Sequence, residues 1–243
     1  MIRYEGFAKV YGRIVAVDHL ELEVRGGETL ALIGPNGSGK TTTLKAAVGL
    51  LRPTRGRVLV EGVDVCRGPH ARARLGYLPQ RISFPEGVSA KETMSFYARL
   101  RGSSTREVGR LLERVGLSDA AARATDGFSG GMRQRLGLAI AMLGSPRVLL
   151  LDEPSAALDP TGALLVRDLI AEIAAGGTTV LLSSHDLTEV EALAHRIAIF
   201  AAGRVSALGT IDQLEAQAGA RGLEATYRRL AEGFGPVSGV RAA

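Results

Sequence analysis

The chain has 243 residues, of which 46% are hydrophobic and 23% charged, and its formal net charge is +5. This length suffices for one large α/β domain, and the composition excludes a disordered, collagen-like or disulfide-stabilised protein. Cys66 is the single cysteine, and no apolar run approaches the roughly 18 residues that span a bilayer. We therefore expect a cytoplasmic protein without a signal peptide, whose membrane role, if it has one, needs a partner.

The basic residues are spread along the chain. Arginines occur from Arg3 to Arg241 without forming a continuous tract, which is typical of a solvated surface rather than of a nucleic-acid-binding patch. We therefore expect no nucleic-acid partner. Cysteine and histidine residues do not cluster at metal-ligand spacing, so no stably bound transition metal is expected.

In chain order, the first predicted element is an antiparallel edge sheet within residues 1–28. Leu20, Leu22 and Val24 alternate there with Glu21 and Glu23, the period of a half-buried strand. Apolar runs at residues 30–33, 148–151 and 180–182 are each followed by a turn and a helix-like stretch. Strands that are apolar on both faces need helices on both sides, so the sequence predicts an α/β fold with a mostly parallel sheet.

Between residues 81 and 145 the strand pattern is absent and helix starts dominate. Ser89 with Glu92, and Ser104 with Glu107, have the spacing of a capping box. We therefore predict a helical subdomain at 81–145, inserted into an α/β core made of 1–80 and 146–232. Residues 233–243 are rich in glycine and other small residues and are predicted to form a flexible tail.

A glycine-rich segment after the first apolar run predicts a phosphate site. It satisfies the pattern G-x-x-x-x-G-K-[ST], in which backbone N–H groups and a helix N-terminus surround a phosphate, as in a P-loop NTPase core. The lysine supplies charge to the β and γ phosphates, and the threonine hydroxyl after it is expected to hold Mg²⁺. The expected nucleotide contacts come from Gly34, Pro35, Asn36, Gly37, Ser38, Gly39, Lys40, Thr41 and Thr42.

Two carboxylates, Asp152 and Glu153, follow the apolar run at 148–151. Ligands of open α/β sheets sit beyond the carboxyl ends of strands, so we expect Asp152 to face Mg²⁺, through water, and Glu153 to act as general base toward the attacking water. His185 follows another predicted strand and could reach a phosphate. A solvated strand end and a structural histidine are the alternative interpretations.

Ser129, Gly130 and Gly131 open a helix-like run through Leu143 and offer a second helix N-terminus for an anion. Because one chain has one phosphate loop, this second site is explained if it closes over the nucleotide of another copy. The alternative is an ordinary serine N-cap with glycine neighbours.

Together these motifs resemble the nucleotide-binding subunit of ATP-binding cassette (ABC) transporters. The resemblance rests on GPNGSGKT at Gly34, Gln80, SGG at Ser129, LLLDEP at Leu149, SAALDP at Ser155 and His185. It implies an ATPase that binds ATP and Mg²⁺, forms a homodimer, and sits on the cytoplasmic face of the inner membrane through an integral membrane permease.

The same resemblance implies further residue roles. Tyr11 stacks on adenine, and Gln80 senses Mg²⁺ and couples to the permease. Ser129, Gly130 and Gly131 bind the partner's γ phosphate. Asp159 lies at the dimer interface, and His185 contacts the γ phosphate.

The signature motif departs from the family's usual Leu-Ser-Gly-Gly-Gln, because Phe128 and Met132 occupy its ends. Met132 cannot donate the hydrogen bonds of a glutamine side chain, so the resemblance does not carry over the family's contact from that position. Residues 131–136 and 223–227 resemble ABC-2 type exporters. Residues 77–80 and 97–100 are similar to the ATPase subunit of the copper-processing transporter that matures nitrous-oxide reductase.

Two other functions share part of this pattern. A soluble ABC ATPase acting on ribosomes or DNA fits the basic charge, but the chain has neither a second cassette nor a coiled-coil insertion. A nucleoside or nucleotide kinase shares the phosphate loop but leaves Glu153 and Ser129–Gly131 without a role.

Overall fold

The computed structural model describes residues 1–67 and 69–232, which fold around two β-sheets. The larger sheet consists of β3 (Thr29–Ile33), β6 (Leu75–Leu78), β7 (Val148–Asp152), β8 (Thr179–Ser183), β9 (Arg196–Ala201) and β10 (Arg204–Gly209). These strands lie in the order β10-β9-β3-β8-β7-β6 and run parallel, except that β10 is antiparallel to β9. The three predicted core strands are therefore confirmed as β3, β7 and β8.

Helices cover both faces of this sheet, because alternate residues of its strands point to opposite sides. Leu149 and Leu151 of β7 belong to one buried cluster, and Val148 and Leu150 belong to the other. The first cluster includes side chains of α6 (Pro160–Ala175), α7 (Leu187–Leu193), α8 (Ile211–Ala218) and α9 (Leu223–Glu232), and the second includes side chains of α1 (Lys40–Ala47) and α2 (Pro69–Ala73).

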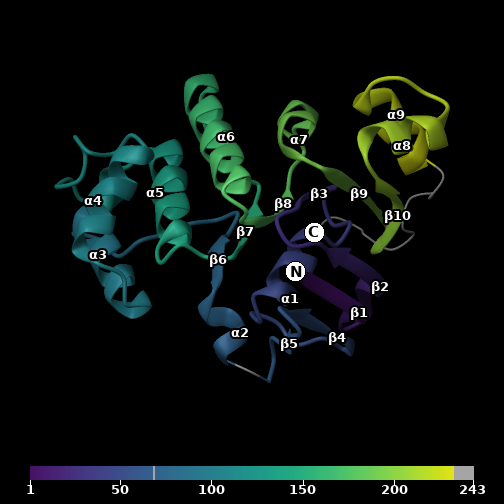
Figure 1. Ribbon diagram of the computed structural model, residues 1–243, viewed down its shortest axis with the longest axis horizontal. Coiled ribbons are helices and arrows are strands. Elements are labelled where there is room, and N and C mark those ends of the chain that lie inside the picture. Colours follow the sequence, from purple (N-terminus) through teal and green to yellow (C-terminus); the bar gives the residue numbers. More distant parts are fainter. Residues whose placement is uncertain (68, 233–243) are drawn as a thin grey trace.

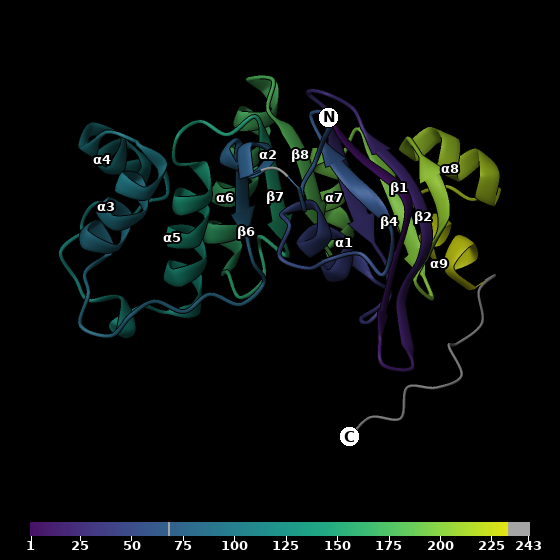
Figure 2. The same cartoon turned by 90° about the horizontal axis from the view of Figure 1, so that it is seen from below.

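The second sheet is antiparallel, as predicted for the N-terminal segment. Its strands, β1 (Ile2–Tyr11), β2 (Ile14–Val24), β4 (Arg55–Val60) and β5 (Val63–Asp64), lie in the order β2-β1-β4-β5. Leu20, Leu22 and Val24 are buried, whereas Glu21 and Glu23 are exposed. These strands form a sheet of their own rather than an edge of the parallel sheet, and the sheet includes β4 and β5 from beyond residue 28 (Figure 2). Its buried side chains pack in one cluster with those of α1.

Residues 81–145 contain only helices among their regular elements, namely α3 (Ala90–Arg101), α4 (Thr105–Arg114), a 3-10 turn at Thr125–Gly127 and α5 (Gly130–Met142). These helices gather at one end of the molecule, and α8 and α9 lie at the opposite end (Figure 1). The division into a core and a helical subdomain stays a prediction. The tail predicted at 233–243 lies outside the described residues.

The two predicted capping boxes differ in the structure. At α3, Ser89 and Glu92 satisfy each other's backbone N–H groups, which confirms the box. At α4, Ser104 accepts the N–H of Glu107, but the Glu107 carboxylate accepts the N–H of Gly144 at 2.9 Å. The prediction of a complete second box was wrong, because a tertiary donor after α5 competes for that carboxylate.

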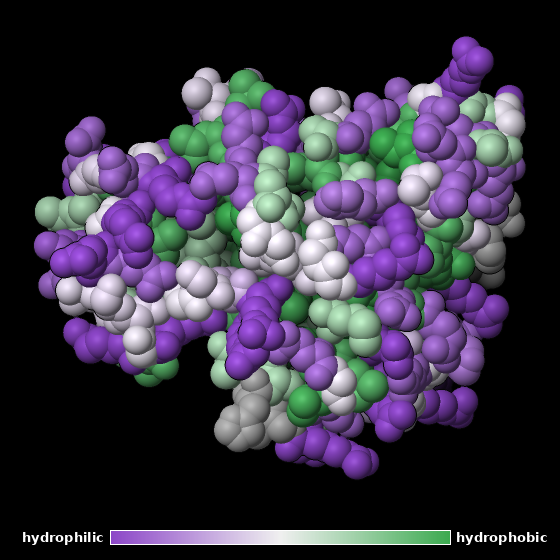
Figure 3. All heavy atoms as spheres, viewed as in Figure 1, coloured by the Kyte–Doolittle hydropathy of each residue, from purple (hydrophilic) through white to green (hydrophobic). Residues whose placement is uncertain are grey.

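Among residues 1–67 and 69–232, no helix has the length and apolar character required to cross a bilayer. On the face shown in Figure 3, apolar side chains form separate patches between polar ones.

Candidate functional site

The glycine-rich loop between β3 and α1 is shaped by close backbone approaches. Gly34 and Gly39 have φ values of 149° and 109°, in the region that favours glycine. A Cβ at Gly34 would lie 2.3 Å from the carbonyl oxygen of Phe200, and one at Gly39 would lie 2.6 Å from that of Ala16. Gly39 also provides no side-chain cap for α1, so the helix N-terminus is available to an anion.

The Lys40 side chain is buried inside this loop, with 6% of the residue exposed. Its Nζ donates to the carbonyl oxygens of Gly34 at 2.6 Å and Pro35 at 3.2 Å. Burial lowers the pKa of Lys40, although the nearby carboxylates of Glu153 and Asp152 act in the opposite direction. A phosphate in the loop would supply the negative charge that stabilises this ammonium.

Asp152, the last residue of β7, has one satisfied carboxylate oxygen and one unsatisfied oxygen. Its Oδ1 accepts hydrogen bonds from Thr41 Oγ1 at 3.0 Å and Ser183 Oγ at 2.7 Å, whereas its buried Oδ2 has no hydrogen-bond partner. Burial raises the pKa of Asp152, and the two hydroxyl donors partly offset this effect. A hydroxyl beside an unsatisfied carboxylate oxygen fits a hard divalent cation such as Mg²⁺, which prefers oxygen ligands.

Glu153 follows β7 with φ 55°, a left-handed conformation that is unfavourable for a residue with a side chain. Its N–H donates to the carbonyl oxygen and to Oγ of Ser183, both at 3.1 Å. Its carbonyl oxygen accepts Nε2 of Gln134 at 3.0 Å. Hydrogen bonds on both sides of the residue therefore hold this backbone in place.

The carboxylate of Glu153 is paired with His185, two residues beyond β8. His185 Nδ1 lies 2.6 Å from Glu153 Oε2, and the His185 backbone N–H donates to the same oxygen at 3.3 Å. The Glu153 side chain is only 8% exposed, whereas that of His185 is 72% exposed. His185 can therefore contact both the carboxylate and an incoming phosphate.

A cavity of about 420 Å³ joins these groups. Its lining residues come from the end of β3 and the phosphate loop, from the segments that follow β6, β7 and β8, and from α7 and α9; they are Ile33, Gly34, Pro35, Asn36, Gln80, Glu153, Ser184, His185, Leu187 and Tyr227. The cavity thus places Gln80, Glu153 and His185 beside the loop. An anionic phosphate entering here would meet a helix N-terminus, and a carboxylate lies beside it to accept a proton from water.

Other residues named from the sequence lie outside this cavity. Tyr11 is 48% exposed at the end of β1, with Lys9 Nζ 5.0 Å from its ring centre. Ser129 is the exposed N-cap of α5 and accepts the Met132 N–H at 3.2 Å. Asp159, also exposed, caps α6 by accepting the Gly162 N–H.

The glycines of the signature motif lie close to the loop that follows Glu153. A Cβ at Gly131 would lie 3.2 Å from Leu158 Cδ2, and a Cβ at Gly130 would lie 3.5 Å from the Ala157 side chain. Ser129 and Gly130 are exposed at this helix N-terminus, and neither glycine lines the cavity.

Sequence reasoning missed several residues that shape the site. Ser183 contacts both Asp152 and Glu153, and its place directly before Ser184 and His185 at a strand end was the available signal. Gln134 and Tyr227 reach the site from α5 and α9. No spacing rule indicates such long-range contacts.

A buried carboxylate, Glu189, lies behind the site. Ser155 and Ser184 donate their hydroxyls to Oε1 and Oε2 of Glu189, the latter at 2.6 Å. Burial raises the pKa of Glu189 despite these two hydrogen bonds, and Asp186 and Glu153 raise it further.

The Glu189→Gln substitution should change how stability depends on pH. Because the pKa of Glu189 is raised from 4.5 in the folded chain, its ionisation makes the free energy of unfolding fall as pH rises from 4.5 through the folded-state pKa. The glutamine variant lacks this loss, so its stability relative to wild type should increase over that window. Glu189→Ala should instead cost about 1–3 kcal/mol, because two hydroxyls lose their acceptor. Urea unfolding at pH 4 and pH 7 measures both effects, and an equal Gln-to-wild-type difference at the two pH values would contradict the assignment.

Comparison with known proteins identifies the family. A family model described as ABC transporter matches residues 17–156, more than half of the chain. The chain belongs to the ABC transporter family. It is an ATP-binding subunit of this family, its activity is ATP hydrolysis, and the resemblance seen in the sequence is confirmed.

This ABC transporter chain has relatives that cover nearly its whole length. It is 40% identical over 232 residues to the daunorubicin resistance ATP-binding protein DrrA3 of Streptomyces coeruleorubidus, an alignment covering 93% of this chain and 73% of the relative. A solved ATP-binding subunit of an ABC transporter is 31% identical, with a TM-score of 0.87 over 95% of this chain and 99% of the other. These similarities confirm the predicted fold and the relation to ATP-binding subunits of ABC transporters.

The fold is also shared with the dimeric structure of the ABC transporter cassette MJ0796. That protein is 24% identical, with a TM-score of 0.81 over 86% of this chain and 98% of the other. At this identity the similarity concerns the fold.

Proposed function

We propose that this chain is the motor of an ABC exporter, in which two copies enclose ATP between them and drive a separate membrane permease. One observation carries the proposal. A single chain gathers the phosphate loop, Glu153 and His185 around one cavity, while Ser129–Gly131 form an exposed helix N-terminus outside it. A second copy related by two-fold symmetry would bring that helix N-terminus over the open side of the nucleotide.

Hydrolysis proceeds by attack of water on the γ phosphate, with Glu153 as the general base. Its carboxylate is held by His185, which contacts the same oxygen through both Nδ1 and the backbone N–H. A water in line with the γ phosphate loses a proton to Glu153 as its oxygen bonds to phosphorus, and ADP leaves. Lys40 and the N-terminus of α1 stabilise the charge on the phosphates.

We assign Mg²⁺ to the unsatisfied side of Asp152, with Thr41 and Gln80 completing the protein contribution. Thr41 Oγ1 is already 3.0 Å from Asp152 Oδ1, and Gln80 lines the same cavity as Glu153. When bound, the ion would neutralise charge on the β and γ phosphates. Asp152 would contribute through water, because Mg²⁺ keeps several of its waters.

The adenine of ATP stacks on Tyr11, whose ring is exposed on the β1–β2 hairpin. Asp159 lies close to the two-fold axis. It follows Leu158, whose side chain lies beside Gly131 of the signature motif in the same chain. The dimeric structure of MJ0796, which shares the fold, supports a two-fold arrangement.

The permease contacts the helical end of the molecule, beside α3. A groove of about 720 Å³ is lined there by Pro85, Gly87, Val88, Lys91, Glu92, Thr93, Ser95, Phe96, Tyr97 and Arg99. Phe96 is 51% exposed and Leu100 is 69% exposed on the same helix, and exposed apolar groups at a groove favour a protein partner. Gln80 lines the nucleotide cavity and precedes the groove residues in the sequence, so we propose that it couples the groove to the nucleotide. The chain is then bound to the cytoplasmic face of the membrane.

The transported molecule is assigned only by class. DrrA3 is named for daunorubicin resistance, which supports export of an organic molecule. The similarity of residues 77–80 and 97–100 to the copper-processing transporter stays a prediction, and a neighbouring cluster of periplasmic copper-protein genes would support it.

The Lys40→Ala substitution tests the nucleotide site directly. It removes the side-chain cation of the phosphate loop, and a hydrogen bond to a charged group contributes about 1.5–3 kcal/mol. We therefore expect ATP to bind about 10- to 100-fold more weakly in titration calorimetry. Lys45→Ala, on the exposed side of the same helix, is the matched control and should bind ATP normally. Unchanged affinity in the Lys40 variant would refute the site.

A further inference from the structure

Gln134 is the one polar side chain among the buried residues of α5. It is 5% exposed, and its neighbours on α5 that are buried include Leu136 and Leu138. A buried amide requires hydrogen-bond partners. Its Nε2 donates at 3.0 Å to the backbone carbonyl oxygen of Glu153, which is nineteen positions away in the sequence.

This carbonyl belongs to a residue whose backbone is unfavourable without support. Glu153 has φ 55°, and β8 supports only its N–H side, through Ser183. On the carbonyl side, the oxygen accepts two hydrogen bonds, a local one from the Ala156 N–H at 3.2 Å and a long-range one from the Gln134 amide at 3.0 Å. Ser183 and Gln134 therefore tie the peptide plane of Glu153 to β8 and to α5, and the orientation of this plane influences where the carboxylate lies relative to the water and to His185.

Gln134 also lies one helical turn beyond the start of the signature helix. Residues three or four apart share a helix face, and Gly131 packs against Leu158 and Ala157, in the loop that follows Glu153. The same face of α5 therefore touches Glu153 and the loop after it. A shift of α5 cannot leave the Glu153 backbone unaffected while this hydrogen bond persists.

We infer that Gln134 is a positioning residue, which makes the alignment of the catalytic base depend on the signature helix of its own chain. This inference rests on the proposed two-fold arrangement, in which that helix begins at the partner's nucleotide. Contact of Ser129–Gly131 with the partner's γ phosphate then influences Glu153 at the other nucleotide, and the two sites communicate through one helical turn and one hydrogen bond.

The first test is the Gln134→Met variant, which keeps the length of the side chain and removes the donor. We expect kcat to fall about tenfold, the factor that corresponds to about 1.4 kcal/mol. The Kd for ATP should stay within about twofold of wild type, because the side-chain hydrogen bond of Gln134 goes to the Glu153 backbone rather than to the phosphate loop. An unchanged kcat in a folded variant would overturn the inference, and so would an equal loss in ATP affinity.

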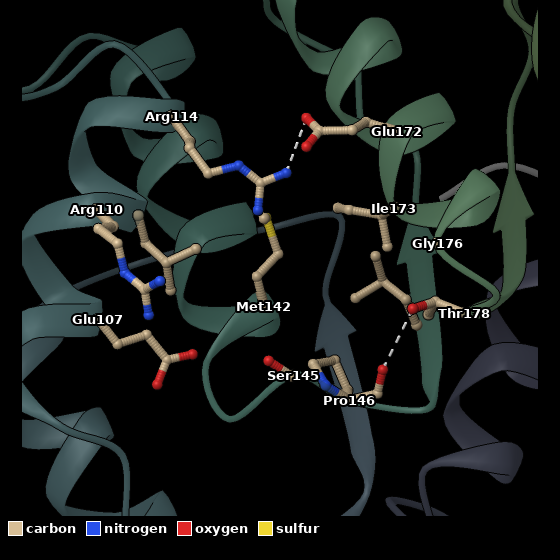
Figure 4. A pocket seen from close by; sticks show the side chains of 12 residues that line it. Glu107, Arg110, Arg114, Met142, Ser145, Pro146, Glu172, Ile173, Gly176 and Thr178 are labelled. Atoms are coloured by element: carbon tan, nitrogen blue, oxygen red, sulfur yellow. Dashed lines mark hydrogen bonds and ion pairs between the residues drawn. The ribbon is translucent and has the colours of Figure 1, made fainter.

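Two control variants separate positioning from general loosening. Gln217→Met makes the same change at an exposed position of α8. Arg114→Met breaks a different link between the helical end and the core, the 2.9 Å ion pair of Arg114 with Glu172 across a cavity of about 330 Å³ between α4 and α6 (Figure 4). Both should keep kcat within about twofold of wild type. A loss in Arg114→Met as large as in Gln134→Met would refute a specific role for Gln134.

Heterodimers purified through two different tags test which site Gln134 serves. In the first, Gln134→Met is on the chain that keeps Lys40, and the other chain carries Lys40→Ala. In the second, Gln134→Met and Lys40→Ala are on the same chain. The first should lose turnover by the same factor as the homodimer, and the second should match a wild-type and Lys40→Ala heterodimer.

The reverse pattern would overturn the inference, because it would show that Gln134 acts only through its signature motif on the partner's nucleotide. Inactivity of the wild-type and Lys40→Ala heterodimer would instead count against independent sites in the proposed dimer. In that case the kcat and Kd of the Gln134→Met homodimer decide the inference.

Discussion

Glu153→Gln should bind ATP normally and hydrolyse it about 10² to 10⁴ times more slowly than wild type, the range that a general base contributes. The substitution keeps the shape of the side chain and removes the group that accepts the proton. His185 is still within reach of an oxygen at the 2.6 Å position, so the geometry of the cavity should persist. Phosphate release at saturating ATP measures the effect.

A matched variant, Glu113→Gln, changes an exposed glutamate of α4 and should hydrolyse ATP at the wild-type rate. Near-normal turnover in Glu153→Gln would reject Glu153 as the base. Loss of ATP binding in the same variant would show that the residue holds the nucleotide rather than the water.

The same variant also reports on association. An ATP that cannot be hydrolysed should keep two chains together, so Glu153→Gln should be a dimer with ATP and a monomer without it. Light scattering distinguishes the two states. A size that does not respond to nucleotide would contradict the two-fold arrangement.

The sequence predicted the parts of this molecule that local pattern determines. Runs of apolar residues located β3, β7 and β8, and the phosphate-loop pattern placed Lys40 at the start of a helix. These assignments succeed because a buried strand and a glycine-rich turn each need particular residue types in immediate succession. Glu153 and His185 were each predicted at the carboxyl edge of the parallel sheet, whereas their direct pairing emerged only from the structure.

Contacts that depend on tertiary packing were not predicted. Glu107 fits a capping box by spacing but bonds to Gly144, and Tyr227 reaches the cavity from a C-terminal helix. In the sequence, Gln134 is one polar residue among several in its helix. The structure shows that its Nε2 donates a hydrogen bond to the backbone carbonyl oxygen of Glu153. Each of these contacts joins segments that are far apart in the sequence. Their spacing follows neither the helix nor the strand repeat, so a local sequence pattern does not indicate them.

Mixing Ser129→Arg chains with Lys40→Ala chains should restore ATP hydrolysis that neither variant shows alone. If Ser129 acts on the nucleotide held by the partner's Lys40, one composite site of the heterodimer has lost both groups and the other has kept both. The structure is consistent with this arrangement, because Ser129 is exposed and does not line the cavity of its own chain. Phosphate release should therefore rise on mixing and be greatest near equal amounts.

If Ser129 instead served the nucleotide of its own chain, every site in the mixture would be damaged and no ratio could restore activity. Ser118→Arg, at an exposed serine of the same helical region, controls for the added charge and bulk and should be active alone. A flat response, with heterodimers confirmed by two-tag purification, would refute either the action in trans or the independence of the two sites. The wild-type and Lys40→Ala heterodimer separates these outcomes, because it contains one intact site whichever chain supplies the serine. Activity of that heterodimer beside an inactive mixture would place Ser129 in its own chain's site.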